Sequence, residues 1–156
     1  MPRKYTPPKQ ELQPDVRYGS LLVSDFINRI MMGGKKSVAQ RIVYDALDLI
    51  GERTGKPPLE VLEKAVGNIR PALEVKPRRV GGSTYQIPVE VPQRRQASLA
   101  MRWLLDAARS RPGHSMAEKL AAELMDAANE TGAAYRKKDE TYRMAQANRA
   151  FAHYRW

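Results

Sequence analysis

Apolar residues recur at three- and four-residue spacing along most of the chain, which is the period of an amphipathic helix. Between residues 20 and 71 this pattern predicts three helices, with breaks at Gly33-Gly34 and near Gly55. Two further helices are predicted after residue 92, separated by the segment at 111–113. The pattern therefore indicates a helical body.

Capping residues support these boundaries. Ser20 stands just before the first apolar stripe and is a good N-cap, and the second helix is expected from about Ser37. Ser115 and Glu118 have the spacing of a capping box at the start of the fifth helix. Gly132 is expected to end that helix, because glycine readily adopts the left-handed conformation found after helix C-termini.

The period changes from 3.6 to 2 within residues 72–91, where the sequence predicts a β-hairpin that turns at Gly81-Gly82. Pro77 and Pro88 each lack a backbone N–H, which suits the edges of a two-stranded ribbon without a third strand. Strands of about eight residues, at roughly 3.3 Å per residue, would carry the tip about 25 Å from the root. We therefore expect the hairpin to protrude, with its tip out of reach of the helical core.

The two ends of the chain differ from the body. Four prolines and several cations in residues 1–19 predict an extended basic arm. Residues 133–152 are rich in alanine and in basic residues, which indicates a helix lying on the surface. The expected fold is thus mainly α, a bundle of about six helices. We expect residues 20–156 to form a single domain that includes the hairpin and the basic C-terminal helix.

The charge of the chain indicates a polyanionic partner. The 156 residues contain 27 Lys and Arg against 17 Asp and Glu, a net charge of +10. Basic segments at 1–36, 76–114 and 133–156 alternate with segments in which acidic residues outnumber basic ones. A fold that presents one positive surface from several separated segments would have this pattern.

Groups for catalysis or metal binding are scarce. Cysteine is absent, and His114 and His153 stand alone, without the spacing of metal ligands. The stretch MMGGKKS lacks the spacing of a nucleotide-binding loop, although its glycines and lysines could hold a phosphate at a helix start. We expect no enzyme activity, no cofactor and no small-molecule substrate. Without a membrane-length apolar run or a signal peptide, a cytoplasmic protein is expected.

The hairpin carries residues suited to binding a nucleic-acid backbone. Its first strand carries several cations, its glycines permit close approach, and Tyr85 is available to stack on a base. The alternative is a solvated loop that happens to be basic. Trp103 has two interpretations as well, a core residue or a ring that stacks on a partner.

The nucleic acid could be DNA or RNA. A basic β-arm beside a helical body also describes architectural proteins that bend DNA through its minor groove. The cations here, however, come from the N-terminal arm, a helix junction, the hairpin and two further helices, so the contact surface is broad and irregular. A folded RNA with converging helices would contact such a surface at more places than a uniform duplex would, so RNA is favoured.

Three blocks of sequence carry a resemblance to a known family. They are YGSLLVSDFINRIMMGGKKSVAQRIVYDAL, VKPRRVGGSTYQIPVEVPQRRQASLAMRWLL and RMAQANRAFAHYRW, and their order and spacing resemble small-subunit ribosomal protein seven of the bacterial type. The resemblance implies direct binding to the 3′ major domain of small-subunit ribosomal RNA and nucleation of the subunit head. It also implies a place near the exit-site transfer RNA and the messenger RNA path, beside proteins of the head and platform.

The resemblance and the charge pattern together select candidate RNA-binding residues. Most of them are cations that would meet phosphates, while the glycines and the tyrosine would shape the hairpin. The candidates are Arg3, Lys4, Lys9, Gly34, Lys35, Lys36, Lys76, Arg78, Arg79, Gly81, Gly82, Tyr85, Arg94, Arg95, Arg102, Arg109, Arg136, Lys137, Lys138, Arg143 and Arg149.

Overall fold

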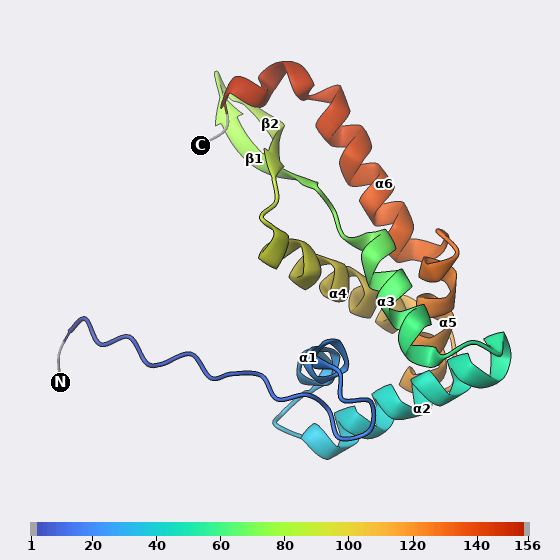
Figure 1. Ribbon diagram of the computed structural model, residues 1–156. Coiled ribbons are helices and arrows are strands. Elements are labelled where there is room, and N and C mark those ends of the chain that lie inside the picture. Colours follow the sequence, from blue (N-terminus) through green and yellow to red (C-terminus); the bar gives the residue numbers. More distant parts are fainter. Residues whose placement is uncertain (1–2, 155–156) are drawn as a thin grey trace.

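The amphipathic stripes fold into six helices, and the alternating segment folds into a hairpin. The computed structural model describes residues 3–154, and Figure 1 shows the arrangement of its elements. The expected mainly α fold with one two-stranded hairpin is confirmed. In chain order the elements are α1 (Leu21–Ile30), α2 (Lys36–Thr54), α3 (Pro58–Ile69), β1 (Leu73–Val80), β2 (Ser83–Glu90), α4 (Gln93–Ser110), α5 (Met116–Ala128), α6 (Gly132–Ala147) and the 3-10 helix η1 (Arg149–Tyr154).

The core is built around α5, which packs against α2, α3 and α4. The apolar stripe of each helix supplies side chains that are at most 1% exposed, among them Leu47, Leu62, Leu104 and Leu124. Helix α1 packs on α2 and α4. Trp103 is 7% exposed and belongs to this core, which decides between its two interpretations.

Several predicted helix boundaries are confirmed. The Ser20 hydroxyl accepts a hydrogen bond from the Val23 backbone N–H at 3.4 Å, and the Ser115 hydroxyl accepts one from the Glu118 N–H at 3.3 Å. Gly55 ends α2 in the left-handed conformation, at φ 66°. These caps satisfy backbone groups that the helix itself leaves unpaired.

The prediction that Gly132 ends the fifth helix is wrong. Helix α5 ends at Ala128, and Glu130 takes the left-handed conformation with φ 58°. Gly132 is instead the first residue of α6, with φ 92°. A Cβ atom there would lie 3.0 Å from a carboxylate oxygen of Glu123, so this position needs glycine for close approach as well as for its backbone angle.

The final helix is shorter than the predicted range 133–152. Helix α6 ends at Ala147, and the backbone N–H and side-chain amide of Asn148 both donate to the Met144 carbonyl, at 3.0 and 2.9 Å. The chain then continues as η1. Asparagine competes with the backbone for hydrogen bonds in this way, which favours the end of a helix.

The hairpin turns at Gly81-Gly82, as predicted, and its register is regular. Val80 pairs with Ser83 across the two-residue turn, in which Gly81 and Gly82 have φ 60° and 84°. This turn makes every second pair a hydrogen-bonded one, counting from Val80 and Ser83. Pro77, opposite Gln86, and Pro88, opposite Val75, therefore fall in the other pairs, where a missing N–H removes no ladder bond.

The hairpin protrudes from the helical body as expected, and its strands are also supported by the C-terminal segment. Helix α6 passes from the body to the hairpin and contacts both strands, and η1 packs on β2 (Figure 1). The Ile87 side chain is fully buried, and the ring of Tyr85 stacks on that of Phe151. The sequence pattern of the C-terminal segment indicates only a surface helix, and it does not show that this segment supports the ribbon.

The N-terminal arm leaves the body at Asp15. The Asp15 carboxylate accepts hydrogen bonds from the backbone N–H groups of Tyr18 and Ser20, both at 2.7 Å, and from the Tyr44 hydroxyl at 3.2 Å. The preceding described residues, 3–14, are exposed and extend away from the helices in Figure 1. Asp15 thus fixes the point from which the arm departs.

Candidate nucleic-acid interface

Three candidate arginines lie on one face of α4. Arg95, Arg102 and Arg109 follow one another at intervals of seven residues, which is close to two helical turns, and all three are exposed. We call these three residues the arginine stripe. It begins beside the root of the hairpin and runs along α4. Arg94, next to it at the start of α4, is also exposed.

The stripe meets α1 at a shallow hollow of about 170 Å³. Arg29 of α1 lines this hollow together with Arg102 and Arg109. Its guanidinium lies 3.1 Å from the Asp25 carboxylate and donates to the Ser98 hydroxyl at 3.0 Å. Arg29 was not among the candidates, because periodicity alone does not show that the last turn of α1 faces the stripe.

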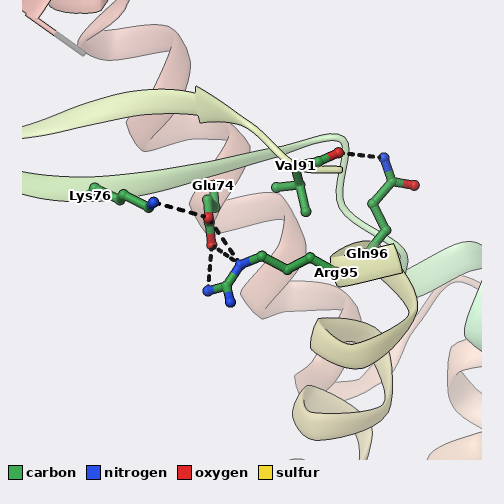
Figure 2. Close-up of polar contacts among 5 residues, drawn as sticks. All are labelled: Glu74, Lys76, Val91, Arg95 and Gln96. Carbon is green, nitrogen blue, oxygen red and sulfur yellow. Dashed lines mark hydrogen bonds and ion pairs between the residues drawn. The ribbon is translucent and has the colours of Figure 1, made fainter. Parts of the chain in front are cut away.

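The root of the hairpin carries a carboxylate between two candidate cations, as Figure 2 shows. Arg95 Nε and Nη2 donate to the two carboxylate oxygens of Glu74 at 3.2 Å each. Lys76 Nζ lies 4.0 Å from the same carboxylate. Arg95 and Lys76 are therefore already paired within the protein.

Backbone and side-chain contacts tie the hairpin root to three helices. The Val91 N–H donates to the Ala72 carbonyl at 3.0 Å, and the Gln96 side chain of α4 donates to the Val91 carbonyl at 3.0 Å (Figure 2). The Ala72 N–H donates to the Tyr142 hydroxyl of α6 at 2.7 Å. Arg70, which follows α3, donates to the Gln93 carbonyl at 3.3 Å. The direction in which the hairpin leaves the body is fixed by these bonds.

The strand and tip of the hairpin place their candidates in solvent, with one exception. Residues 76–79 of β1 and the glycines of the turn are exposed. Tyr85, expected to be available for a base, has one ring face covered by Phe151, at a centroid distance of 4.4 Å and an interplanar angle of 29°. Its observed contact is with its own chain.

The loop before α2 presents a second group of candidates. Gly34, Lys35 and Lys36 are exposed at the N-terminus of this 19-residue helix, whose first turn holds no acidic residue. Two ammonium groups beside a helix N-terminus form a favourable place for an anion.

The candidates on α6 divide into two groups. Arg136 and Lys137 are exposed and line a hollow of about 380 Å³, and Arg143 pairs with Asp139 at 3.0 Å. Lys138 instead donates to the Asn68 carbonyl at 2.7 Å, and burial lowers the pKa of its ammonium group. The contacts of Lys138 join α6 to α3, which is a packing role. Arg149 is exposed on η1.

One cation outside the candidates has a clear structural role. Arg111 pairs with Glu123 at 2.8 Å and with Asp126 at 2.7 Å, and the hydrogen bond to Asp126 raises the pKa of Arg111. The buried Glu123 also accepts from the Ala134 N–H at 3.1 Å. This cluster, in which only Glu123 of the three charged residues is buried, joins the ends of α4, α5 and α6. The acidic residues near 115–132 thus include core partners as well as surface charge.

The described residues, 3–154, contain no group of three or more acidic or histidine side chains that could hold a metal ion. Within the same residues, no helix is long and apolar enough to cross a membrane.

Comparison with known proteins gives full-length matches. The family model described as ribosomal protein S7p/S5e matches residues 2–149. The proteins called small ribosomal subunit protein uS7 in Thermomicrobium roseum and Rubrobacter xylanophilus are each 58% identical to this chain over 156 residues. The protein of the same name in Caldicellulosiruptor saccharolyticus is 59% identical over 157 residues. Each alignment covers 100% of both chains.

The sequence blocks that suggested a family, the helical fold with its hairpin and the full-length relatives agree. The chain belongs to the ribosomal protein S7p/S5e family.

Proposed function

We propose that this protein binds the 3′ major domain of small-subunit ribosomal RNA directly and nucleates assembly of the subunit head. The observation that carries the proposal is the arginine stripe, which runs from the hairpin root to the hollow shared with Arg29. Guanidinium groups bind phosphates bidentately, and a row of them on a rigid helix can follow an RNA backbone.

A folded RNA fits this surface better than a DNA duplex. Besides the stripe, exposed cations lie before α2, on the hairpin and on α6, so the positive groups come from elements with different directions. A regular duplex would meet few of them at once, whereas junctions of several RNA helices could meet many. A DNA-bending role would require the hairpin to lie in a minor groove, and nothing in its contacts favours that.

The hairpin supports a second part of the proposal, contact with the exit-site transfer RNA and the messenger RNA path. Its root is held by α4 and α6, while residues 76–79 and the tip are exposed. A held root with an exposed basic strand and tip suits an element that reaches a second RNA. We further propose that residues 20–156 act as one domain and that Arg3, Lys4 and Lys9 of the N-terminal arm contact RNA. We also propose that the protein contacts neighbouring proteins of the head and platform.

The test measures binding to a transcript of the 3′ major domain by filter binding over a range of salt concentrations. Each phosphate contact on a duplex contributes about −0.9 to the slope of log K against log salt, so a steep slope is expected. The variant Arg102→Ala/Arg109→Ala should weaken binding and flatten the slope by about 2. The control is Arg53→Ala, an exposed arginine in the last turn of α2, and the two variants are compared per charge removed.

Three outcomes would overturn the proposal. They are a flat salt response, an equal effect of the control variant, and tighter binding to a DNA duplex than to the transcript at equal salt.

A further inference from the structure

We propose that Ser98 is a positioning residue, which holds the Arg29 guanidinium beside the arginine stripe in an orientation that suits a phosphate of the RNA. The inference rests on the proposed RNA-binding function and deepens it at one place, the hollow between α1 and α4. Ser98 is not among the residues that line this hollow, so its effect on binding would pass through Arg29.

Two hydrogen bonds hold the Arg29 guanidinium. Its Nε donates to the Asp25 carboxylate at 3.1 Å, and its Nη2 donates to the Ser98 hydroxyl at 3.0 Å. Asp25 stands four residues earlier on the same helix, so its bond orients the guanidinium with respect to α1. Ser98 belongs to α4, and its bond therefore fixes Arg29 with respect to the stripe.

The held guanidinium keeps donors for a phosphate. A guanidinium carries five N–H groups in a rigid plane, and the two bonds use one group each, so three groups remain. The Arg29 side chain is 30% exposed and lines the hollow, which places it within reach of a ligand from solvent. A phosphate in the hollow can therefore accept from Arg29 while both bonds persist.

A neutral hydroxyl is well suited to this role. Arg29, Arg102 and Arg109 line one hollow, and their like charges favour arrangements in which Arg29 turns away from the stripe. The Ser98 hydroxyl opposes this turn without adding a negative charge that would repel a phosphate.

The place of Ser98 on α4 adds to this argument. Ser98 lies four residues before Arg102, so the two share one face of the helix. A long side chain that is oriented in advance loses less entropy when a ligand binds it. Ser98 would therefore raise the affinity of the hollow for a phosphate without contacting the phosphate itself.

The experiment measures binding of full-length Ser98→Ala and wild-type protein to the 3′ major domain transcript by filter binding. The variant should bind about threefold to fivefold more weakly, because one long side chain is no longer ordered in advance. The salt slope should stay the same, since no charge is removed. Alanine is a better helix former than serine, so the melting temperature should not fall.

Two further variants serve as controls. Ser110→Ala makes the same substitution near the end of α4, where the hydroxyl donates to the Asp106 backbone carbonyl, and it should bind as the wild type does. Ser98→Thr keeps a hydroxyl at the same position and should retain most of the affinity.

A double-mutant cycle tests whether Ser98 acts through Arg29. In the Arg29→Ala background, Ser98→Ala should change the affinity by less than about twofold, because the side chain that it orients is gone. A serine that contacts the RNA itself, or that merely supports α4, would have the same effect in both backgrounds.

The outcomes separate this inference from the proposed function. If Ser98→Ala binds as tightly as Ser110→Ala, weakens binding equally in both backgrounds or lowers the melting temperature, the inference is wrong and the function stands. The same holds if Ser98→Thr binds as weakly as Ser98→Ala, or if Arg29→Ala leaves the affinity unchanged. If the wild-type protein shows a flat salt response, or prefers a DNA duplex to the transcript at equal salt, the proposed function itself fails.

Discussion

The ring of Tyr85 in β2 stacks on the ring of Phe151 in η1, with centroids 4.4 Å apart. This contact joins two segments that are far apart in the sequence. Together with the packing of α6, it holds the hairpin in place through contacts within the same chain. A two-stranded ribbon is marginal by itself in water, so such a support is needed. The direction of the hairpin therefore depends on the last described residues as much as on its root.

Replacing Phe151 with Ala should loosen the hairpin without unfolding the body. Aromatic pairs contribute about 0.5–1.5 kcal/mol beyond their buried area, so a loss of roughly 1–2 kcal/mol in local stability is expected. Hydrogen exchange should become faster in β1 and β2 and stay unchanged in α2 and α5. The control is Met144→Ala, at an exposed methionine on α6. Equal acceleration in α5 would show instead that η1 supports the whole fold.

Gly132→Ala should destabilise the protein. The backbone at this position has φ 92°, and an added Cβ would lie 3.0 Å from a Glu123 oxygen and 3.1 Å from the Asp126 Cβ. Backbone strain and crowding of the buried Glu123 should together cost about 1–3 kcal/mol in the free energy of unfolding.

Gly67→Ala is the matched control for that substitution. Gly67 lies inside α3 without a positive φ, and a Cβ atom added there would meet no neighbouring atom within 4 Å. Alanine there should stabilise the protein by up to about 1 kcal/mol, because glycine is a poor helix former. Urea denaturation measures both variants. A neutral Gly132→Ala would mean that the contact with Glu123 relaxes without cost.

Tyr44→Phe should change how stability depends on alkaline pH. Burial first, and then the neighbouring Asp15 carboxylate, raise the pKa of Tyr44 above its ordinary value of 10.0. Since the folded state holds this proton more tightly than the unfolded state, its contribution is complete below pH 10 and is lost as pH rises through the folded pKa. The wild-type protein should therefore lose stability relative to Tyr44→Phe above about pH 10.

Urea denaturation at several pH values checks this prediction. Between about pH 7 and 9 the difference between the two proteins should be constant, because Tyr44 is protonated in both states. A difference that changes with pH in that range would contradict the assignment of the pKa shift to Tyr44. Comparing the two proteins removes the contribution of Tyr18, whose pKa burial also raises, because both proteins contain it.

Much of the fold could be predicted from periodicity and capping, and the errors have local causes. The Ser20 and Ser115 caps follow from one residue and its near neighbours, and they are confirmed. The role of Gly132 depends on Glu123, which approaches from another helix, so a sequence pattern cannot show it. Support of the hairpin by Phe151 likewise depends on a contact between segments distant in sequence.

The choice of candidate RNA-binding residues also depends on contacts between segments that are distant in the sequence. Family membership confirms the expectations of a cytoplasmic ribosomal protein that is not an enzyme. Charge counting treats all cations alike, although Lys138 is bonded to the Asn68 carbonyl, Arg111 to the buried Glu123, and Arg95 to Glu74. Arg29 was not selected as a candidate, because its place beside Arg102 arises from the packing of α1 on α4.

Arg29→Ala should weaken binding to the 3′ major domain transcript, although no sequence pattern selects this residue. Arg29 lines the hollow with Arg102, Arg109 and the Asp106 carboxylate, which lies 3.9 Å from Arg109, so the hollow holds three arginines against one acidic residue and favours a phosphate. Losing one charged hydrogen-bonding group should cost about 1.5 kcal/mol, or roughly tenfold in affinity, and should flatten the salt slope by about 1. Because Arg29 also pairs with Asp25, Arg29→Lys is a useful second variant that keeps the charge and should retain most of the binding.

Filter binding measures affinity, and a thermal melt shows whether loss of the bond to Ser98 affects the fold. If Arg29→Ala binds the transcript as tightly as Arg53→Ala does, the hollow is not a phosphate site and the interface is confined to α4 and the hairpin.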